Sequence, residues 1–311
     1  MSITPNYIGV DIAKRWSDVY DPATRRHACI NMDDKSLKAF IKKLPKGAHL
    51  VFEASGGYER PLQDMLIRHG IAYSRMNPRR VREFARASGH LAKTDKVDAK
   101  VLTKMGELFT PDPTLPPCPH RQNLSALVAR REDLVADKVA ETNRLQQARG
   151  SFIRNDIKSH IELLKRRILK VEAEMQRLVA KTPELAALNA RLQSAPGLGP
   201  ITAASLIARL PELGRVNRRA IAALAGLAPH ACESGIKIGK RRTWGGREGV
   251  RRSLYQAAFI ASRFDPALKA YRKRLQDAGK PFKVAIIATA RKLLTQLNAI
   301  VKEARDYQKI T

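Results

Sequence analysis

The chain has 311 residues, of which 44% are hydrophobic, so its length and composition predict a globular protein of about two domains. Lys and Arg number 58 against 29 Asp and Glu, which gives a formal net charge of +29. A field of this sign attracts polyanions and speeds their capture, so the charge predicts a nucleic-acid partner. On charge alone, a structural RNA-binding protein of the ribosomal kind fits as well as an enzyme.

The sequence also argues against a membrane protein and against a disulfide framework. No apolar run approaches the ~20 residues of a membrane span, and the start of the chain lacks a signal-peptide pattern. Cys29, Cys118 and Cys232 lie far apart with no CxxC pair, which indicates a reducing compartment. The pairs Cys118 with His120 and His230 with Cys232 have a spacing unusual for zinc, so we interpret them as loop residues.

The first hundred residues alternate between strand and helix patterns. The expected strands are residues 7–10, 17–20, 27–30, 49–52 and 72–76, and the expected helices are 35–44, 61–69 and 78–87. This order, βββαβαβα, predicts a mixed sheet with helices on its faces, an α/β fold.

Five prolines between residues 111 and 119 exclude a helix or a central strand there and predict a linker. Two long helical stretches follow, the first over residues 124–145. In the second, apolar residues step by four and three in a heptad pattern: Ile157, Ile161, Leu164, Ile168, Val171, Met175 and Leu178. Such a seam predicts an antiparallel helical hairpin, a dimer contact, or both.

Pro183 is expected to end the second long helix, and the chain from about Leu192 is expected to contain only helices and Gly-rich loops. This last part is strongly basic, since residues 237–252 hold seven Lys or Arg against a single Glu. We therefore divide the chain into residues 1–110, 111–185 and 186–311.

Four acids form the first candidate site. Asp11 and Glu53 follow two strands that a mixed sheet of this order can place side by side, so their carboxylates are expected at one sheet edge. Asp95 and Asp98 are three apart, which places both on one face of a helix. Converging carboxylates repel one another without a cation between them, and oxygen ligands of this kind suit Mg²⁺ or Mn²⁺. For the pair on the helix alone, stabilisation of the helix start is the better explanation, and the placement of Asp11 and Glu53 at strand ends is what favours a metal site.

The segment PGLGPITAASLIARL, residues 196–210, places two glycines and a proline before a helix. This pattern is similar to a helix–hairpin–helix, which grips a backbone phosphate without reading sequence. A simple turn between two helices explains the same residues equally well.

The third candidate site is a Gly-rich basic segment, residues 226–252. Ser234 lies there between Glu233 and Gly235, followed by several Lys and Arg residues. A serine surrounded by cations has the chemistry to attack a phosphodiester, although most loop serines only form turns. A separate run of arginines over residues 75–86 suits a phosphate backbone or a solvated helix face.

Taken in order, the motifs are GVDIAK, VFEASGG, NPRRVREFARASG, AKTDKVDA, SAPGLGP, LAGLAPHACESG, GKPFKVA and ARKLL. Together they resemble the DEDD transposases of the IS110 family over nearly the whole chain. The resemblance implies a RuvC-like RNase H fold in residues 1–110, a coiled-coil middle in 111–185 and a mainly helical transposase domain in 186–311. It also implies a recombinase guided by a bridge RNA that pairs with donor and target DNA.

The resemblance further implies that Asp11, Glu53, Asp95 and Asp98 bind the metal, with Glu53 preferred over Glu59, and that Ser234 forms a phosphoserine link to DNA. It implies a homo-oligomer, a dimer or a tetramer, in which one protomer supplies the acids and another the serine. We expect the protein in the cytoplasm of a prokaryotic cell, at the nucleoid when active. The expected nucleic-acid contacts are Arg79, Arg80, Lys93, Lys237, Lys240, Arg241, Arg242 and Arg247.

Two other functions remain open from the sequence. A RuvC-like junction nuclease on the same fold would use metal-bound water and leave Ser234 idle. A basic RNA-binding protein would have no catalysis at all. The family also contains site-specific invertases, which differ from transposases in role more than in residues.

Overall fold

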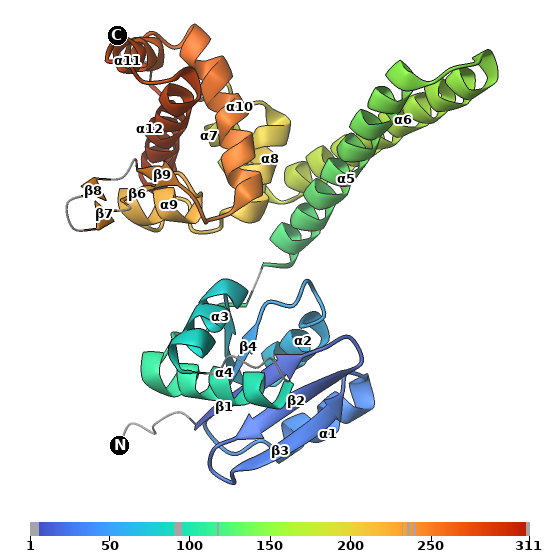
Figure 1. The fold of residues 1–311 in the computed structure, drawn as a ribbon, viewed down its shortest axis with the longest axis vertical. Helices are drawn as coiled ribbons and strands as arrows, with labels where there is room; N and C mark the ends of the chain where they lie inside the picture. The colour runs from blue at the N-terminus through green and yellow to red at the C-terminus, as the bar shows by residue number, and fades with distance from the viewer. Residues whose placement is uncertain are drawn as a thin grey trace. The chain divides into compact units, whose positions relative to one another are not determined.

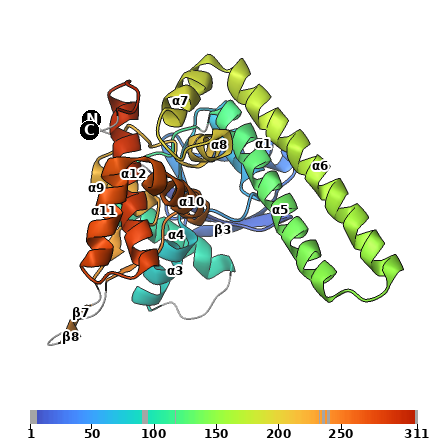
Figure 2. The same ribbon diagram turned by 90° about the horizontal axis from the view of Figure 1, so that it is seen from above.

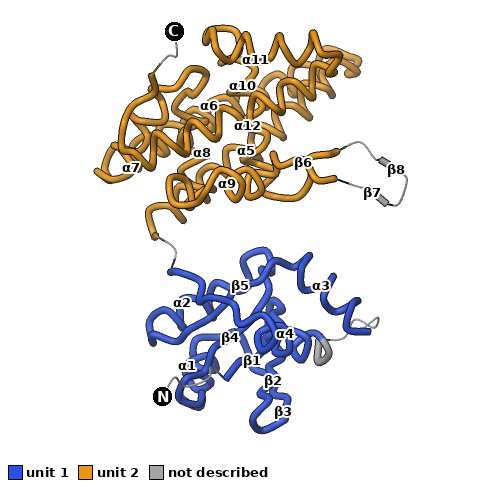
Figure 3. The backbone as a smooth tube through the Cα atoms, turned by 90° about the vertical axis from the view of Figure 1, so that its left-hand side faces the viewer, with its two compact units in different colours: residues 1–116 blue, residues 117–311 orange. Residues whose placement is uncertain are grey.

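The computed structural model describes residues 6–89, 95–116, 118–231, 233–234, 237–238 and 241–308; for 95–97, 233–234 and 237–238 it describes only the backbone. The chain forms two compact units, residues 1–116 and 117–311 (Figure 3). The predicted linker joins them, and its described residues between Phe109 and Pro119 form no helix or strand. Pro119 itself begins a helix, because a proline is tolerated at the first helical position. The division into three functional parts stays a prediction.

The first unit confirms the predicted order of strands and helices. Its elements are β1 (Asn6–Ile12), β2 (Trp16–Asp21), β3 (Arg26–Asn31), α1 (Asp34–Lys43), β4 (Ala48–Glu53), α2 (Arg60–Arg68), β5 (Ala72–Met76), α3 (Pro78–Ala87) and α4 (Asp95–Phe109). The sheet order is β3-β2-β1-β4-β5. Strand β2 is antiparallel to both of its neighbours, β1 and β3, whereas β1, β4 and β5 run parallel to one another. This mixed sheet fits the expected α/β, RNase H-like fold.

Alternate residues of the strands belong to two separate cores, one on each face of the sheet, whose helices can be followed in Figure 1. Val10, Leu50 and Phe52 belong to the core that also contains buried residues of α1 and α2. Tyr7 and Val51 point the other way and pack with buried residues of α3 and α4. The period of two along each strand thus decides which helices cover which face of the sheet.

The second unit begins with a long helical hairpin, α5 (Pro119–Gln147) and α6 (Ser151–Lys181), whose helices run side by side (Figure 2). Leu164 and Ile168 of the heptad seam pack on Leu134 of α5. Arg131 of α5 adds an ion pair with Glu172 of α6 at 2.6 Å. The hairpin that the seam predicts is therefore confirmed, and self-association stays a prediction.

The rest of the second unit is mainly helical, with α7 (Pro183–Gln193), α8 (Pro200–Arg209), α9 (Arg218–Leu224), α10 (Glu248–Phe264), α11 (Pro266–Asp277) and α12 (Phe282–Lys302). As predicted, Pro183 marks the end of the long helix, which stops at Lys181. Among the described residues, one helix, α12, is long and apolar enough to cross a membrane by length and composition, and half of that stretch is buried inside the unit. Its buried side chains, including Leu293 and Leu297, belong to the core.

The prediction that this part contains only helices and loops is wrong for residues 229–243. Four two-residue strands lie there: β6 (Pro229–His230), β7 (Glu233–Ser234), β8 (Lys237–Ile238) and β9 (Arg242–Thr243). The outer pair β6–β9 and the inner pair β7–β8 are both antiparallel, so the segment forms a narrow ribbon. Such short strands carry no alternating apolar pattern, and their pairing is invisible in the sequence.

Candidate functional site

Asp11 and Glu53 lie on neighbouring parallel strands near their carboxyl ends. The register of β1 and β4 pairs Val10 with Phe52, and Asp11 and Glu53 are the next residue on each strand. Neighbours in register share a face of the sheet, and here it is the face covered by α4, since Gly9 of β1 lies against that helix. Both residues are half-buried. The structure therefore confirms that these two acids meet at one sheet edge.

Helix α4 crosses β1 at very close range. A Cβ atom at Gly9 would lie 2.0 Å from the Ala99 carbonyl oxygen, and one at Gly106 would lie 2.9 Å from the Tyr7 side chain. The buried Thr103 hydroxyl accepts a hydrogen bond from the Gly9 amide at 2.8 Å. These contacts run in opposite orders along the two elements, so α4 is antiparallel to β1, with its beginning toward Asp11.

The same register places the first turn of α4, which carries the other two acid positions, near the end of β1. Ala99, Thr103 and Gly106 form the stripe of α4 that faces the sheet. Asp95 occupies the position one turn before Ala99, and Asp98 the position one turn before the fully buried Leu102. Two strand residues, from Gly9 to Asp11, span about 6.7 Å, close to the ~6 Å of one four-residue helical step. The first turn of α4 therefore lies level with Asp11.

The described side chains do not by themselves form a metal cluster. Among them, no group of three or more His, Cys, Asp or Glu lies at metal-holding distances. Asp98 is half-buried like Asp11 and Glu53, whereas the Asp95 side chain lies outside the described part of the chain. The structure thus brings the four backbone positions to one end of the sheet.

A fifth acid shares this face, and the sequence analysis missed it. Asp18 of β2 is the direct antiparallel partner of Asp11. Side chains directly opposite in such a pair lie on the same face, and like charges there destabilise the sheet. The signal was present in the β1–β2 hairpin, but it needs the register of the two strands to be recognised.

Glu59, the alternative to Glu53, has a structural role. It is buried, and its carboxylate accepts hydrogen bonds from the Ser55 and Gly57 amides at 3.2 and 2.8 Å and pairs with Arg75 at 2.8 Å. Burial tends to raise its pKa, but the loop amides and Arg75 together outweigh it and hold the pKa below 4.5. Its oxygens are thus satisfied by the protein, which gives Glu59 a structural role, and Glu53 as the metal-site acid stays a prediction.

Ser234 lies at the end of the ribbon. It is the last residue of β7 and pairs with Lys237, the first residue of β8, so only residues 235–236 separate them. The side chains of both lie outside the described part of the chain, but the register places them directly across from each other. The next described pair down the ribbon joins His230 and Arg242. The Ser234 backbone therefore lies opposite one basic position, Lys237, and the role of Ser234 stays a prediction.

The base of the ribbon is held by close backbone packing. A Cβ at Gly246 would lie 2.2 Å from the Gly226 amide nitrogen, and both glycines have positive φ, so other residues would be strained there. The Arg247 amide donates to the Leu224 carbonyl at 2.8 Å. The Arg247 guanidinium donates two hydrogen bonds to the carboxylate of Glu212, both at 2.6 Å. These donors are therefore used within the protein. The predicted contact of Arg247 with nucleic acid stays a prediction.

The other predicted basic contacts fall into two groups. Arg79 and Arg80 are exposed on α3, where Arg79 also pairs with Glu83 at 2.7 Å. Arg241 and Arg242 are exposed on the returning side of the ribbon. Lys93 and Lys240 lie outside the described residues, as does the Lys237 side chain.

The segment 196–210 forms a turn followed by α8. Gly199 caps α8 without a side-chain hydrogen bond, and Pro200 is its first residue. Gly197 has a φ of 78° and approaches the Ala257 carbonyl so closely that a Cβ would lie 2.4 Å from that oxygen. A turn between the helices α7 and α8 is thus present, and phosphate binding by it stays a prediction.

Comparison with known proteins gives consistent similarities. Residues 8–148 match a DEDD family of IS110 type described as a transposase, and residues 189–273 match the Transposase IS116/IS110/IS902 family. The chain is 31% identical over 322 residues to the pilin gene-inverting protein of Moraxella lacunata and 29% identical over 320 residues to that of Moraxella bovis. In both comparisons 99% of each chain is covered. It is also 32% identical over 140 residues to an uncharacterized 43.6 kDa protein of insertion element IS110 from Streptomyces coelicolor, covering 44% of this chain and 34% of that protein.

Proposed function

Since this chain belongs to the IS110 family of transposases, we propose that it is a metal-dependent DNA recombinase that cuts and rejoins DNA through Ser234 under the guidance of a bridge RNA. The observation that carries the proposal is the sheet edge at which Asp11 and Glu53 lie in register and toward which α4 begins. Asp11, Asp18 and Glu53 lie on three neighbouring strands and share this face, although like charges on neighbouring strands destabilise a sheet.

The donor set suits Mg²⁺ or Mn²⁺. Asp11, Glu53, Asp95 and Asp98 offer only carboxylate oxygens, which these hard cations prefer. Cations held by these acids would neutralise charge that develops on a phosphate during phosphoryl transfer. Within the chain, Gly9 and Thr103 fix the distance between the strand acids and the helix acids.

Ser234 is the proposed nucleophile. Its hydroxyl oxygen forms a bond to phosphorus, its proton is lost, and the sugar oxygen of the cut strand leaves as a hydroxyl. A hydroxyl of the new partner strand reverses the step and releases the serine, so the phosphodiester energy is retained and no nucleotide cofactor is needed. The register of Ser234 with Lys237 supports a role for this cation in stabilising the negative charge.

The guide RNA and the oligomer are also proposals. A net charge of +29 supports binding of more phosphates than one DNA duplex site needs. The acids lie in the first unit and Ser234 in the second, which permits a site built from two protomers. A dimer or tetramer would let one protomer's acids serve its partner's serine.

Site-specific inversion of DNA is a second candidate role. The two relatives covered over 99% of their length are both named pilin gene-inverting proteins. Inversion and transposition use the same cutting and rejoining steps and differ in the DNA sites that are joined. The same acids and the same serine would serve either role.

A recombination assay with substituted acids tests the metal site. Asp11→Asn and Glu53→Gln should each lower the rate about a hundredfold or more, because several kcal/mol of charge stabilisation are lost with the cation. Glu107→Gln is the matched control, since Glu107 is an exposed acid on α4, and it should keep the wild-type rate. Full activity of Asp11→Asn in the presence of Mg²⁺ would sink the metal-site proposal.

A further inference from the structure

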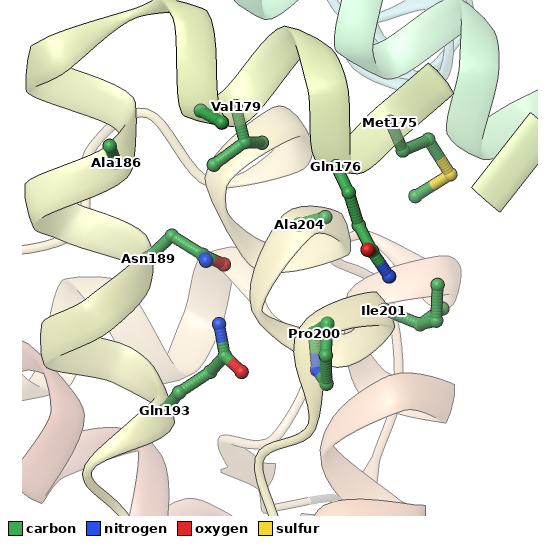
Figure 4. Close-up of a pocket in the computed structure, with 10 residues that line it drawn as sticks. Met175, Gln176, Val179, Ala186, Asn189, Gln193, Pro200, Ile201 and Ala204 are labelled. Carbon is green, nitrogen blue, oxygen red and sulfur yellow. The ribbon is translucent and has the colours of Figure 1, made fainter. Parts of the chain in front are cut away.

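A pocket lies in the second unit where the long hairpin meets the following helices. Its walls come from the end of α6, from α7 and from the beginning of α8 (Figure 4). Its volume is about 280 Å³. Nothing in the proposed chemistry of the acids or of Ser234 uses this pocket.

The lining combines apolar walls with three carboxamides. Val179, Ala186, Ile201 and Ala204 are among the apolar residues. The carboxamides are those of Gln176, Asn189 and Gln193. The lining contains no charged side chain among the described residues, so the pocket suits a neutral ligand.

The three carboxamides are available for a ligand. Asn189 and Gln193 are one turn apart on α7, and Figure 4 shows their amide groups turned toward each other, while Gln176 reaches in from α6. Within the described part of the chain, none of these three side chains has a protein hydrogen-bond partner. Each carboxamide offers both a donor and an acceptor, so the pocket presents a mixed hydrogen-bonding edge between apolar surfaces.

We propose that this pocket holds one unpaired base of a nucleic acid bound to the protein. A base is neutral and flat, with apolar faces and an edge of donors and acceptors, which matches a pocket of apolar walls and carboxamides. Asn and Gln are the side chains that pair with base edges through two hydrogen bonds. Only an unpaired base reaches such a pocket, because a paired base has its edge and faces covered.

This inference rests on the proposed function, because it needs a nucleic-acid partner. It adds recognition of a base to the binding of the phosphate backbone. The beginning of α8 borders the pocket through Pro200 and Ile201. The first amides of that helix lack a side-chain cap, so the phosphate next to the captured base would meet a favourable dipole.

Binding of RNA hairpins to the full-length protein tests the proposal. The probes carry a single bulged A, G, C or U, and a fifth hairpin carries an abasic residue at the bulge. At least one bulged base should bind about fivefold or more tightly than the abasic hairpin, at both low and moderate salt. In the double variant Asn189→Leu/Gln193→Leu, the ratio of the affinity for the bulged hairpin to that for the abasic hairpin should fall to about one. The affinity for the abasic hairpin should not change.

Two further variants sharpen the result. Ala186 is half-buried, and Ala186→Trp fills the pocket, so this variant should also bind bulged and abasic hairpins equally well. Gln147→Leu is the matched control, since it removes an exposed carboxamide from α5 outside the pocket and should keep the ratio. Thermal melting of each variant identifies any that fails to fold, in which case the other pocket variant decides.

The outcomes separate the two proposals. If all four bulged hairpins bind strongly, with salt dependence, but no more tightly than the abasic hairpin, the base-binding pocket is contradicted and the proposed function is not. Pocket variants that keep the wild-type ratio also contradict the base-binding pocket. Weak binding of every hairpin, without dependence on salt, contradicts RNA binding in the proposed function and removes the pocket proposal with it.

Discussion

At the scale of single residues, two glutamates six positions apart differ in their surroundings. Glu59 is enclosed by loop amides and Arg75, so its charge stabilises the fold. Glu53 is the last residue of β4, next to Asp11 on the neighbouring strand β1. In the sequence, only the family motif favoured Glu53 over Glu59 as the metal-site acid, because the two residues are only six positions apart.

Glu59→Gln should destabilise the protein by about 1–3 kcal/mol at neutral pH, since buried amides and Arg75 lose a charged partner. The pKa of Glu59 is lowered in the folded state, so its contribution is fully present above its ordinary pKa of 4.5 and is lost as pH falls through the lower, folded value. The melting temperatures of both proteins should therefore approach each other as the pH falls below 4.5. A difference that stays constant from pH 7 to pH 3 would contradict this role.

The residue scale also shows a limit of prediction. Asp11 and Glu53 could be chosen because each follows an apolar strand pattern, and parallel strands end at the same edge. Asp18 could not, because its relation to Asp11 depends on where the β1–β2 turn sets the register. A one-residue shift would move Asp18 to the other face of the sheet.

At the scale of elements, the contact of α4 with β1 decides where the helix acids lie. Gly9 and Gly106 allow the approach, and Thr103 fixes it with a buried hydrogen bond. The strand and helix patterns predicted both elements. The packing distance was not predictable, because it depends on two small residues far apart in the sequence.

Thr103→Val should destabilise the first unit by about 1–3 kcal/mol, because the Gly9 amide loses its buried acceptor while the volume of the side chain is kept. Its recombination rate should also fall at a temperature where the variant is fully folded, since α4 sets the position of Asp95 and Asp98. Thr103→Ser, which retains the hydroxyl, is the control and should keep most of the rate. Equal stability of the Val and Ser variants would show that this hydrogen bond does not hold the helix.

The ribbon of residues 229–243 is the element that prediction missed. Its strands are two residues long, and glycines at its base replace the side-chain packing that usually reveals a strand. The correction places Ser234 in a short strand opposite Lys237 instead of in a loop.

At the scale of the whole molecule, the long hairpin offers one surface that its own fold already uses and one that stays exposed. Leu164 and Ile168 close the hairpin on itself, so the seam is already used within one chain. Phe152, in contrast, is 81% exposed near the turn of the hairpin. An apolar side chain of this size and exposure is available to a second protomer.

Phe152→Glu should weaken self-association without lowering the melting temperature, because the residue contributes nothing to the hairpin core. Leu164→Glu with Ile168→Glu should lower the melting temperature, because two charges then enter that core. Sedimentation and thermal melting of the two variants separate the effects. If Phe152→Glu keeps the wild-type mass at every concentration, this end of the hairpin is not an oligomer contact.

The central claim is that the serine of the ribbon, and not water, attacks the DNA. The most direct test is to trap the protein on a DNA substrate in the presence of Mg²⁺, denature it and map the site of any covalent bond. The account predicts a DNA adduct on Ser234 in the wild type, and neither adduct nor cleavage with Ser234→Ala, which should still bind nucleic acid because the surrounding basic residues remain. Cleavage by Ser234→Ala at the wild-type rate would contradict the account and identify the protein as a metal-dependent nuclease.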